Sequence, residues 1–202
     1  MEEDNTIVIT KKNRRLLGFL GVEHEYLVIP PEVLSRGKIR RVEAIGENAF
    51  RCSTLERVVL LDGVRSIERQ AFFESPWLLE GVLPRTIQSI GPGAFRNCGR
   101  LKHISIPEGV TELSAYLFRG CADLEGVELP ESITAVRHCA FAFCRSLGDI
   151  SLPGGLESVA NTAFDGCSSL REIHFGGTQA EWRALQYMSV ANVPVICSDG
   201  TV

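Results

Sequence analysis

A phenylalanine recurs at a nearly constant interval through most of this chain. Successive copies are separated by 22, 23, 23, 23 and 23 residues, and all but Phe118 follow an alanine. The copies are Phe50, Phe72, Phe95, Phe118, Phe141 and Phe164. A fixed period of roughly 20–50 residues indicates a repeat protein, in which each unit buries its apolar side against its neighbours. The period therefore predicts one solenoid instead of a set of globular domains.

Each unit continues with the pattern of a short strand. The consensus reads Ala-Phe-x-x-Cys-x-x-Leu-x-x-Ile-x-Ile-Pro-x-x-Val-x-x-Ile-Gly. Alternating apolar positions predict a strand, and proline ends it because it has no backbone donor. Stacked units would place these strands about 4.8 Å apart in a parallel sheet along one face. The phenylalanines are expected to stack as a spine inside it.

Two units depart from the consensus. The first is one residue shorter, and its Cys52 is assigned to the cysteine position. The second has Ser75 at that position and Gly81 where a branched residue is expected. We expect the strand around Gly81 to be distorted or slipped.

The repeated unit resembles the BspA-type leucine-rich repeat of bacterial surface proteins, which is related to the treponemal leucine-rich repeats. The resemblance covers residues 27–175, with 27–45 as a divergent first coil. It implies an α/β repeat fold, a leucine-rich-repeat solenoid of 23-residue units with a parallel sheet on one face. It also implies a curved interaction scaffold, often part of an adhesin, and does not imply an enzyme.

Caps are expected at both ends, because a bare end of a solenoid would aggregate. We predict one domain overall, composed of an N-terminal β cap at 1–26, the solenoid at 27–175 and a helix-strand cap at 176–202. Residues 6–10 and 15–20 are predicted to form a hairpin. Thr178 and Glu181 form a capping-box pattern that opens a short helix, with Trp182 as a lid and a closing strand at 194–197.

The chain contains seven cysteines, which raises the question of a metal site. Four of them, Cys98, Cys121, Cys144 and Cys167, share one repeat position, so they would form a line of roughly 14 Å. One tetrahedral zinc ion cannot gather such a line, and the coil spacing exceeds the Cβ separation of a disulfide. We predict a ladder of buried thiols, with burial also for Cys139 and Cys197, and no metal or cofactor.

Histidines do not suggest a catalytic site. His103 and His174 fall at outward strand positions three coils apart, or roughly 14 Å. They cannot act together. His24 and His138 lie outside the strands and are expected at the surface.

Acidic residues are a stronger candidate. Asp149 and Glu172 share an outward position in adjacent coils, and Glu128 points from the same face. Their spacing is compatible with the roughly 5 Å carboxylate pair of a retaining glycosidase, but an open sheet face does not exclude water. Weak calcium binding, a cationic partner or a solvated acidic face remain alternatives. We predict no catalytic residues and no enzyme.

The outward strand positions form the candidate partner surface. They are Arg57, Val59, Glu80, Val82, His103, Ser105, Glu128, Asp149, Ser151, Glu172 and His174. Its N-terminal half is more apolar and its C-terminal half more acidic. We therefore predict a non-catalytic protein-protein interaction scaffold, adhesin-like by the resemblance, whose protein or peptide partner carries a basic segment. A carbohydrate-binding surface and a structural spacer are the alternatives, the first disfavoured because these columns hold no aromatic residue.

Composition limits the other partners. The net charge is −4, whereas nucleic-acid binding requires a cationic surface. No run of about 18 uncharged apolar residues is present, so we expect no membrane insertion, and we expect a monomer. The resemblance places the protein at the bacterial cell surface or outside the cell. The start Met1-Glu2-Glu3-Asp4 is not a signal peptide, so a complete chain would be cytoplasmic.

Overall fold

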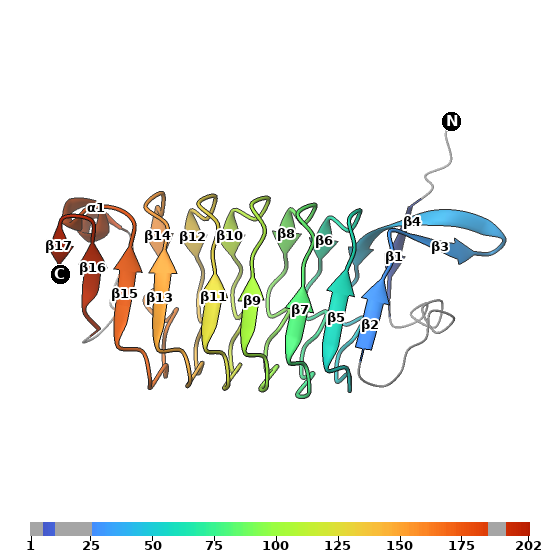
Figure 1. The fold of residues 1–202 in the computed structure, drawn as a ribbon, viewed down its shortest axis with the longest axis horizontal. Coiled ribbons are helices and arrows are strands. Elements are labelled where there is room, and N and C mark those ends of the chain that lie inside the picture. Colours follow the sequence, from blue (N-terminus) through green and yellow to red (C-terminus); the bar gives the residue numbers. More distant parts are fainter. Residues whose placement is uncertain (1–5, 11–25, 186–192) are drawn as a thin grey trace.

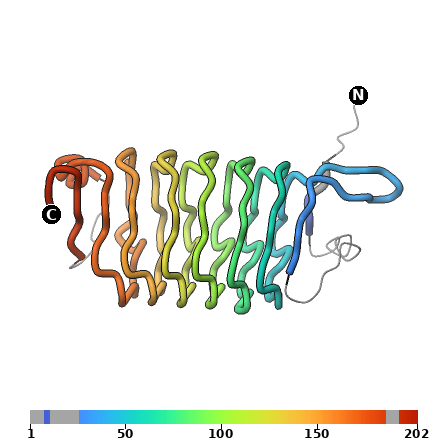
Figure 2. Tube along the Cα trace, viewed as in Figure 1, coloured from blue at the N-terminus to red at the C-terminus, as the bar shows by residue number. Residues whose placement is uncertain are grey.

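The computed structural model describes residues 6–10, 26–185 and 193–202. These residues form a parallel-strand solenoid of about six stacked turns of roughly 23 residues (Figure 1). The trace in Figure 2 passes from coil to coil in chain order, so each coil contacts only its neighbours in sequence. The predicted leucine-rich-repeat solenoid is confirmed. The coils themselves contain no helix in the described part of the chain.

One face of the solenoid carries the main sheet. Its first part has five parallel strands, β2 (Tyr26–Ile29), β5 (Arg57–Leu60), β7 (Glu80–Val82), β9 (His103–Ser105) and β11 (Gly126–Glu128). Its second part has β13 (Asp149–Leu152), β15 (Glu172–Phe175), β16 (Val195–Cys197) and β17 (Gly200–Thr201). Strands β11 and β13 are neighbours in Figure 1 but belong to separate sheets. We call the outer side of both parts the sheet face.

A second row of shorter strands runs behind the first. It comprises β1 (Thr6–Ile9), β4 (Lys38–Ile45), β6 (Ser66–Ile67) and β8 (Ser89–Ile90), followed by β10 (Glu112–Leu113), β12 (Ala135–Val136) and β14 (Ser158–Val159). Most of these strands have two residues, because the repeat turns again around the spine phenylalanine. Together the two rows enclose the apolar core.

The phenylalanines stack as predicted. Consecutive rings from Phe50 to Phe164 have centroids 5.3 to 5.8 Å apart and planes within 22° of parallel. The four central rings are fully buried. The spine is therefore continuous from the first coil to the last.

The thiol ladder is also present. Each of its four cysteines donates a hydrogen bond to the carbonyl of the spine phenylalanine in the preceding coil, at 3.1 to 3.2 Å. Ser75 makes the same bond to Phe50 at 2.9 Å, which explains why serine replaces cysteine there. All seven cysteines are free, and Cys139 and Cys197 are buried as predicted.

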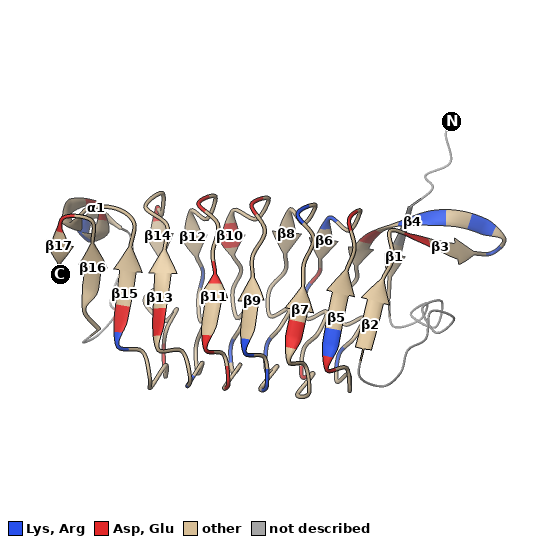
Figure 3. Cartoon of the chain, viewed as in Figure 1, with Lys and Arg blue, Asp and Glu red and all other residues tan. Residues whose placement is uncertain are grey.

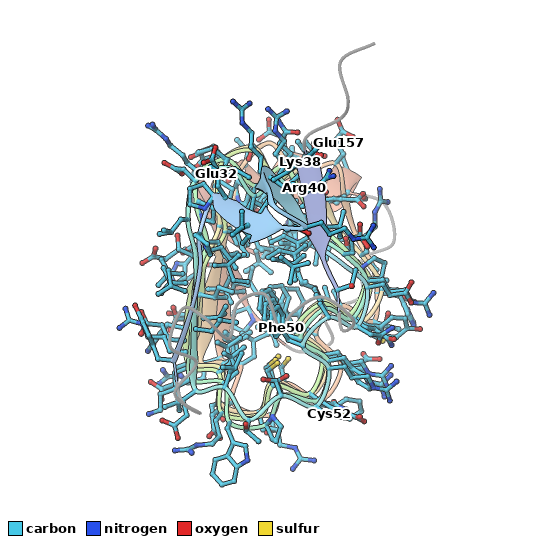
Figure 4. All side chains as sticks on the ribbon, turned by 90° about the vertical axis from the view of Figure 1, so that its right-hand side faces the viewer. Glu32, Lys38, Arg40, Phe50, Cys52 and Glu157 are labelled. Carbon is cyan, nitrogen blue, oxygen red and sulfur yellow. The ribbon has the colours of Figure 1, made fainter. Side chains whose placement is uncertain are left out.

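The assignment of Cys52 to the ladder was wrong. Its backbone N–H donates to the carbonyl of Phe73, so Cys52 occupies the position one residue before the ladder position. Its side chain is exposed (Figure 4). The residue aligned with Ser75 is Ser53, whose N–H bonds the Ser75 hydroxyl at 3.2 Å. The missing residue of the first unit therefore lies after position 53.

Of the two outcomes expected at Gly81, a distorted or a slipped strand, the structure shows a local distortion without a slip. Gly81 stays in register with Val58, although the pairing of β7 with β9 is reduced to Glu80 and His103. Side chains of Ile104 and Val58 approach the place of the missing Cβ, at 3.6 and 3.8 Å. Neighbouring branched residues thus fill most of the space and keep the strand in place.

The N-terminal cap differs from the prediction. Strand β1 pairs in parallel with β4, and the predicted hairpin partner at 15–20 lies outside the described residues. The antiparallel hairpin observed is instead β3 (Glu32–Ser35) with β4. Its turn residues Arg36 and Gly37 both have positive φ, which matches the twist of a tight hairpin. The interpretation of 27–45 as a divergent first coil did not include this hairpin.

The C-terminal cap matches the predicted helix and strand. Helix α1 (Gln179–Ala184) begins with a capping box, in which Thr178 and Glu181 exchange hydrogen bonds. Donation from Thr178 lowers the pKa of the Glu181 carboxyl. Trp182 is 3% exposed and its ring lies 5.2 Å from that of Phe175, so it closes the last coil.

Candidate functional site

The predicted partner surface lies on the strands of the sheet face. Eight of its residues are exposed and three are half-buried, namely Val59, Glu172 and His174. Intervening strand residues point into the core, so outward and inward positions alternate as in a half-buried strand. In Figure 3, acidic residues lie on β7, β11, β13 and β15 and a basic residue on β5.

The N-terminal part of this face is charge-compensated. Arg57 on β5 pairs with Glu80 on β7, with Nε and Oε2 3.0 Å apart. The same arginine lies over the ring of Tyr26, 5.5 Å from its centroid. Tyr26 is 42% exposed and in register with Arg57, so the outward row begins one strand earlier than predicted, with an aromatic residue.

The middle of the face is hollowed. An open depression of about 800 Å³ is lined by residues of β7, β9, β11 and β13. Gly126 lies in it between His103 and Asp149 and carries no side chain to fill it. Lys102 and Glu125 also line it and form an ion pair at 3.3 Å. Sequence reasoning missed these two, although both occupy the repeat position just before the strand.

The C-terminal part carries the uncompensated acidic charge. Asp149 and Glu172 are paired in register on β13 and β15, as the repeat predicts. His174 contacts Glu172, with Nε2 and Oε1 3.1 Å apart. Within residues 6–10, 26–185 and 193–202, no basic side chain forms an ion pair with Asp149 or Glu128. Both carboxylates line the depression.

The structure does not bring the outward histidines together. His103 lies on β9 against Glu125, at 3.7 Å, whereas His174 lies on β15. Among the described residues no group of three or more histidine, cysteine or acidic side chains is arranged to hold a metal ion. His24 lies outside the described residues.

One contact between a cysteine and a base was not anticipated. His138 Nε2 lies 3.3 Å from the Sγ of Cys139, and its Nδ1 lies 2.6 Å from the Thr162 hydroxyl. His138 is exposed as predicted, and Cys139 is buried. The depression on the sheet face does not reach these residues. The adjacency of His138 and Cys139 in the sequence was the available signal.

Three of the four ladder thiols are held in their neutral form, whereas the hydrogen bond with Cys144 lowers the pKa of the Cys167 thiol. Burial raises the pKa of the Cys98 thiol to about 12, and burial raises that of Cys121 well above its ordinary value. A hydrogen bond with Cys167, together with burial, raises the pKa of Cys144. Nucleophilic attack and metal binding both require the thiolate, so the neutral thiols of Cys98, Cys121 and Cys144 serve packing.

A solenoid of short parallel strands with a spine of rings and an open sheet face is a leucine-rich-repeat scaffold. The sequence pattern described as "BspA type Leucine rich repeat region (6 copies)" matches residues 35–98 and 73–190. This match covers more than half of the chain, so the chain belongs to the BspA type leucine-rich repeat family. Members are repeat scaffolds suited to protein interaction and are generally not enzymes.

Solved structures of similar proteins agree with this fold. A leucine-rich repeat protein of T. pallidum superposes with a TM-score of 0.72 at 25% identity, covering 91% of this chain and 88% of its own. A leucine rich cell surface protein of Faecalibacterium prausnitzii gives a TM-score of 0.66 at 27% identity, covering 96% of this chain and 54% of its own. A leucine-rich repeat protein of Bacteroides ovatus gives 0.60 at 27% identity, covering 78% and 49%.

The chain thus spans about half the length of the last two proteins. A search of curated protein sequences gives no match. No helix in the described ranges is long and apolar enough to cross a membrane.

Proposed function

We propose that the chain is an interaction module whose sheet face binds a basic segment of a protein or peptide. The observation that carries this proposal is a pair of carboxylates beside an open depression, Glu128 and Asp149, which form no ion pair within the described part of the chain. Other acids of the face already have a cation, as Glu80 has Arg57. A lysine or arginine of a partner would complete the pairing at the vacant positions.

Gly126 supports the same location. A chain laid across the depression can approach the backbone there, because the only atoms within 4 Å of a Cβ built at Gly126 belong to the His103 ring. The eleven outward residues of the predicted surface are accordingly proposed as contacts, with the acidic half as the part that selects a basic partner.

Charge reversal tests this proposal. A fluorescein-labelled peptide that alternates lysine and serine serves as the probe in anisotropy titrations. The variant E128K/D149K/E172K should bind at least about tenfold more weakly, because three attractions become repulsions. The matched control is D62K/E131K/E157K, which changes the net charge equally at exposed positions away from the face. Unchanged affinity in the first variant, or equal loss in the control, would contradict the proposal.

We also propose an adhesin-like role at the bacterial cell surface. Support comes from the similar protein of Faecalibacterium prausnitzii, which is described as a leucine rich cell surface protein. Brief protease treatment of intact host cells, followed by detection of this chain, tests the location. Full protection of the chain would argue against it.

A further inference from the structure

A row of alternating arginine and aromatic side chains runs along the turns around the spine. We define the arginine row as Arg51, Phe73, Arg96, Tyr116, Arg119 and Phe143. Between consecutive members of the row, the guanidinium carbon and the ring centroid are 4.9, 5.3, 5.7, 5.8 and 5.3 Å apart, in that order. Arg96 and Arg119 each lie against two rings. The row therefore links five successive coils through one chain of contacts.

The repeat explains why the row forms. The three arginines and Phe73 directly follow a spine phenylalanine, whereas Tyr116 comes two residues before one and Phe143 two after one. The turn around each spine ring brings these three repeat positions to one edge. In Figure 4, Phe50 lies inside the solenoid and Cys52 lies at its outer edge. Arg51 is the residue between them in the sequence.

The charge of the row is compensated only at its first arginine. Arg51 forms an ion pair with Glu74, with NH2 and Oε2 3.5 Å apart. The positions equivalent to Glu74 in the next two coils hold Asn97 and Gly120. No carboxylate among the described residues pairs with Arg96 or Arg119.

The hydrogen-bonding capacity of these arginines is also unfilled. The Nε of Arg96 is buried against its neighbours and has no hydrogen-bond partner among the described residues. Both side chains are half-buried, so their terminal nitrogens remain the groups that a ligand can reach. Because the stacked guanidinium groups are already ordered, binding a partner costs less conformational entropy. Arginine forks bind carboxylates through paired hydrogen bonds.

The geometry selects an extended acidic segment. Arg96 and Arg119 contact the same ring, with their guanidinium carbons 5.7 and 5.8 Å from the centroid of Tyr116, so both lie within reach of one short segment. Alternate side chains of an extended peptide are about 6.7 Å apart, so two acidic residues separated by one can meet both arginines. Phe143, at the end of the row, is 41% exposed and offers an apolar contact to a neighbouring residue of the same segment.

Single-stranded nucleic acid fits the row less well. Its bases bind by stacking on open aromatic faces, whereas Phe73 and Tyr116 are each stacked against two guanidinium groups.

We propose that the arginine row is a second docking surface, separate from the sheet face, which binds an extended protein segment with acidic residues at alternate positions. Arg96 and Arg119 bind its carboxylates, and the rings hold both arginines in position. This surface does not depend on the proposed binding of a basic segment by the sheet face.

Anisotropy titration of the intact chain tests the row. The probe is a fluorescein-labelled peptide that alternates glutamate and serine and ends in leucine, and the reference peptide has glutamine in place of glutamate. The variant R96Q/R119Q should weaken binding about tenfold or more. The matched control R65Q/R85Q removes two exposed arginines away from the row and should change affinity by less than about twofold.

A lysine variant keeps the test decisive if the glutamine variant unfolds. R96K/R119K retains the charge but lacks the planar fork, so it should bind the probe about threefold or more weaker than the original chain. Equal weakening by the control, no weakening by the lysine variant, or tighter binding of an oligonucleotide of equal charge would each overturn the proposal. Because this probe is acidic, failure here leaves the sheet-face titration with its basic probe unaffected.

Discussion

Alanine in place of a central spine ring should destabilise the protein more than the same change at the end of the spine. Phe118 is fully buried and stacks on Phe95 and Phe141, at 5.8 and 5.6 Å. Removing a buried phenylalanine costs about 3–5 kcal/mol, and each lost ring pair contributes about 0.5–1.5 kcal/mol beyond burial. Phe118→Ala should therefore fall near the upper end of this range, which is a large fraction of the roughly 5–15 kcal/mol of a typical domain.

Phe164→Ala is the comparison. Phe164 is 9% exposed and stacks on Phe141 alone in the described structure, at 5.3 Å. It loses one ring pair instead of two, so its cost should be lower by about 1 kcal/mol. Phe118→Leu keeps most of the volume and should cost less than either alanine variant.

Urea unfolding followed by far-ultraviolet circular dichroism measures these differences. The free energy of unfolding of each variant follows from the midpoint and the slope, and an unchanged slope shows that the same unit unfolds. Equal losses for Phe118→Ala and Phe164→Ala would refute the argument from stacking. A loss for Phe118→Leu as large as that for Phe118→Ala would refute it as well.

Two further predictions concern Gly81 and the thiols. Gly81→Ala should stabilise the protein by about 0.5–1 kcal/mol, because the new Cβ would lie at an ordinary contact distance of 3.6 Å from Ile104. Gly91→Ala should destabilise it, because the backbone nitrogen of Arg69 would lie 2.7 Å from the new Cβ. Urea midpoints of both variants check this, and a loss for Gly81→Ala would contradict it. Stability should also fall as pH rises above about 9, because the unfolded chain loses thiol protons from there while folded Cys98 keeps its proton to about pH 12. The control C98S/C121S lacks two buried thiols that stay protonated in the folded chain, so its urea midpoint should fall less between about pH 8 and about pH 10.5. Parallel curves would show that these two thiols play no part.

The repeat period made the spine and the ladder predictable. A ring every 23 residues has to return to the same place in each coil, and Cys98 through Cys167 follow by the same argument. The period does not show where the first unit lacks its residue, because a deletion before Ser53 and one after it leave the same period downstream. The hydrogen bonds of Cys52 to Phe73 and of Ser53 to Ser75 showed that Cys52 lies outside the ladder.

Departures from the period were harder to predict. The β3–β4 hairpin interrupts the first coil, and no repeat position announces it. The depression at Gly126 depends on how far the neighbouring side chains cover the glycine, which has no side chain of its own. These features follow from local packing between coils.

By itself the sequence determined the architecture, because periodic apolar positions can be buried in only one way, by stacking successive coils. It also determined which residues face outward on each strand, since side chains alternate along a strand. Only the tertiary structure decided how charge is distributed over the surface. Arg96, Tyr116 and Phe143 occupy different repeat positions, and the turn around the spine makes them neighbours. Pairing across coils likewise left Glu128 and Asp149 without a cation, which depends on side-chain reach and cannot be read from a one-dimensional pattern.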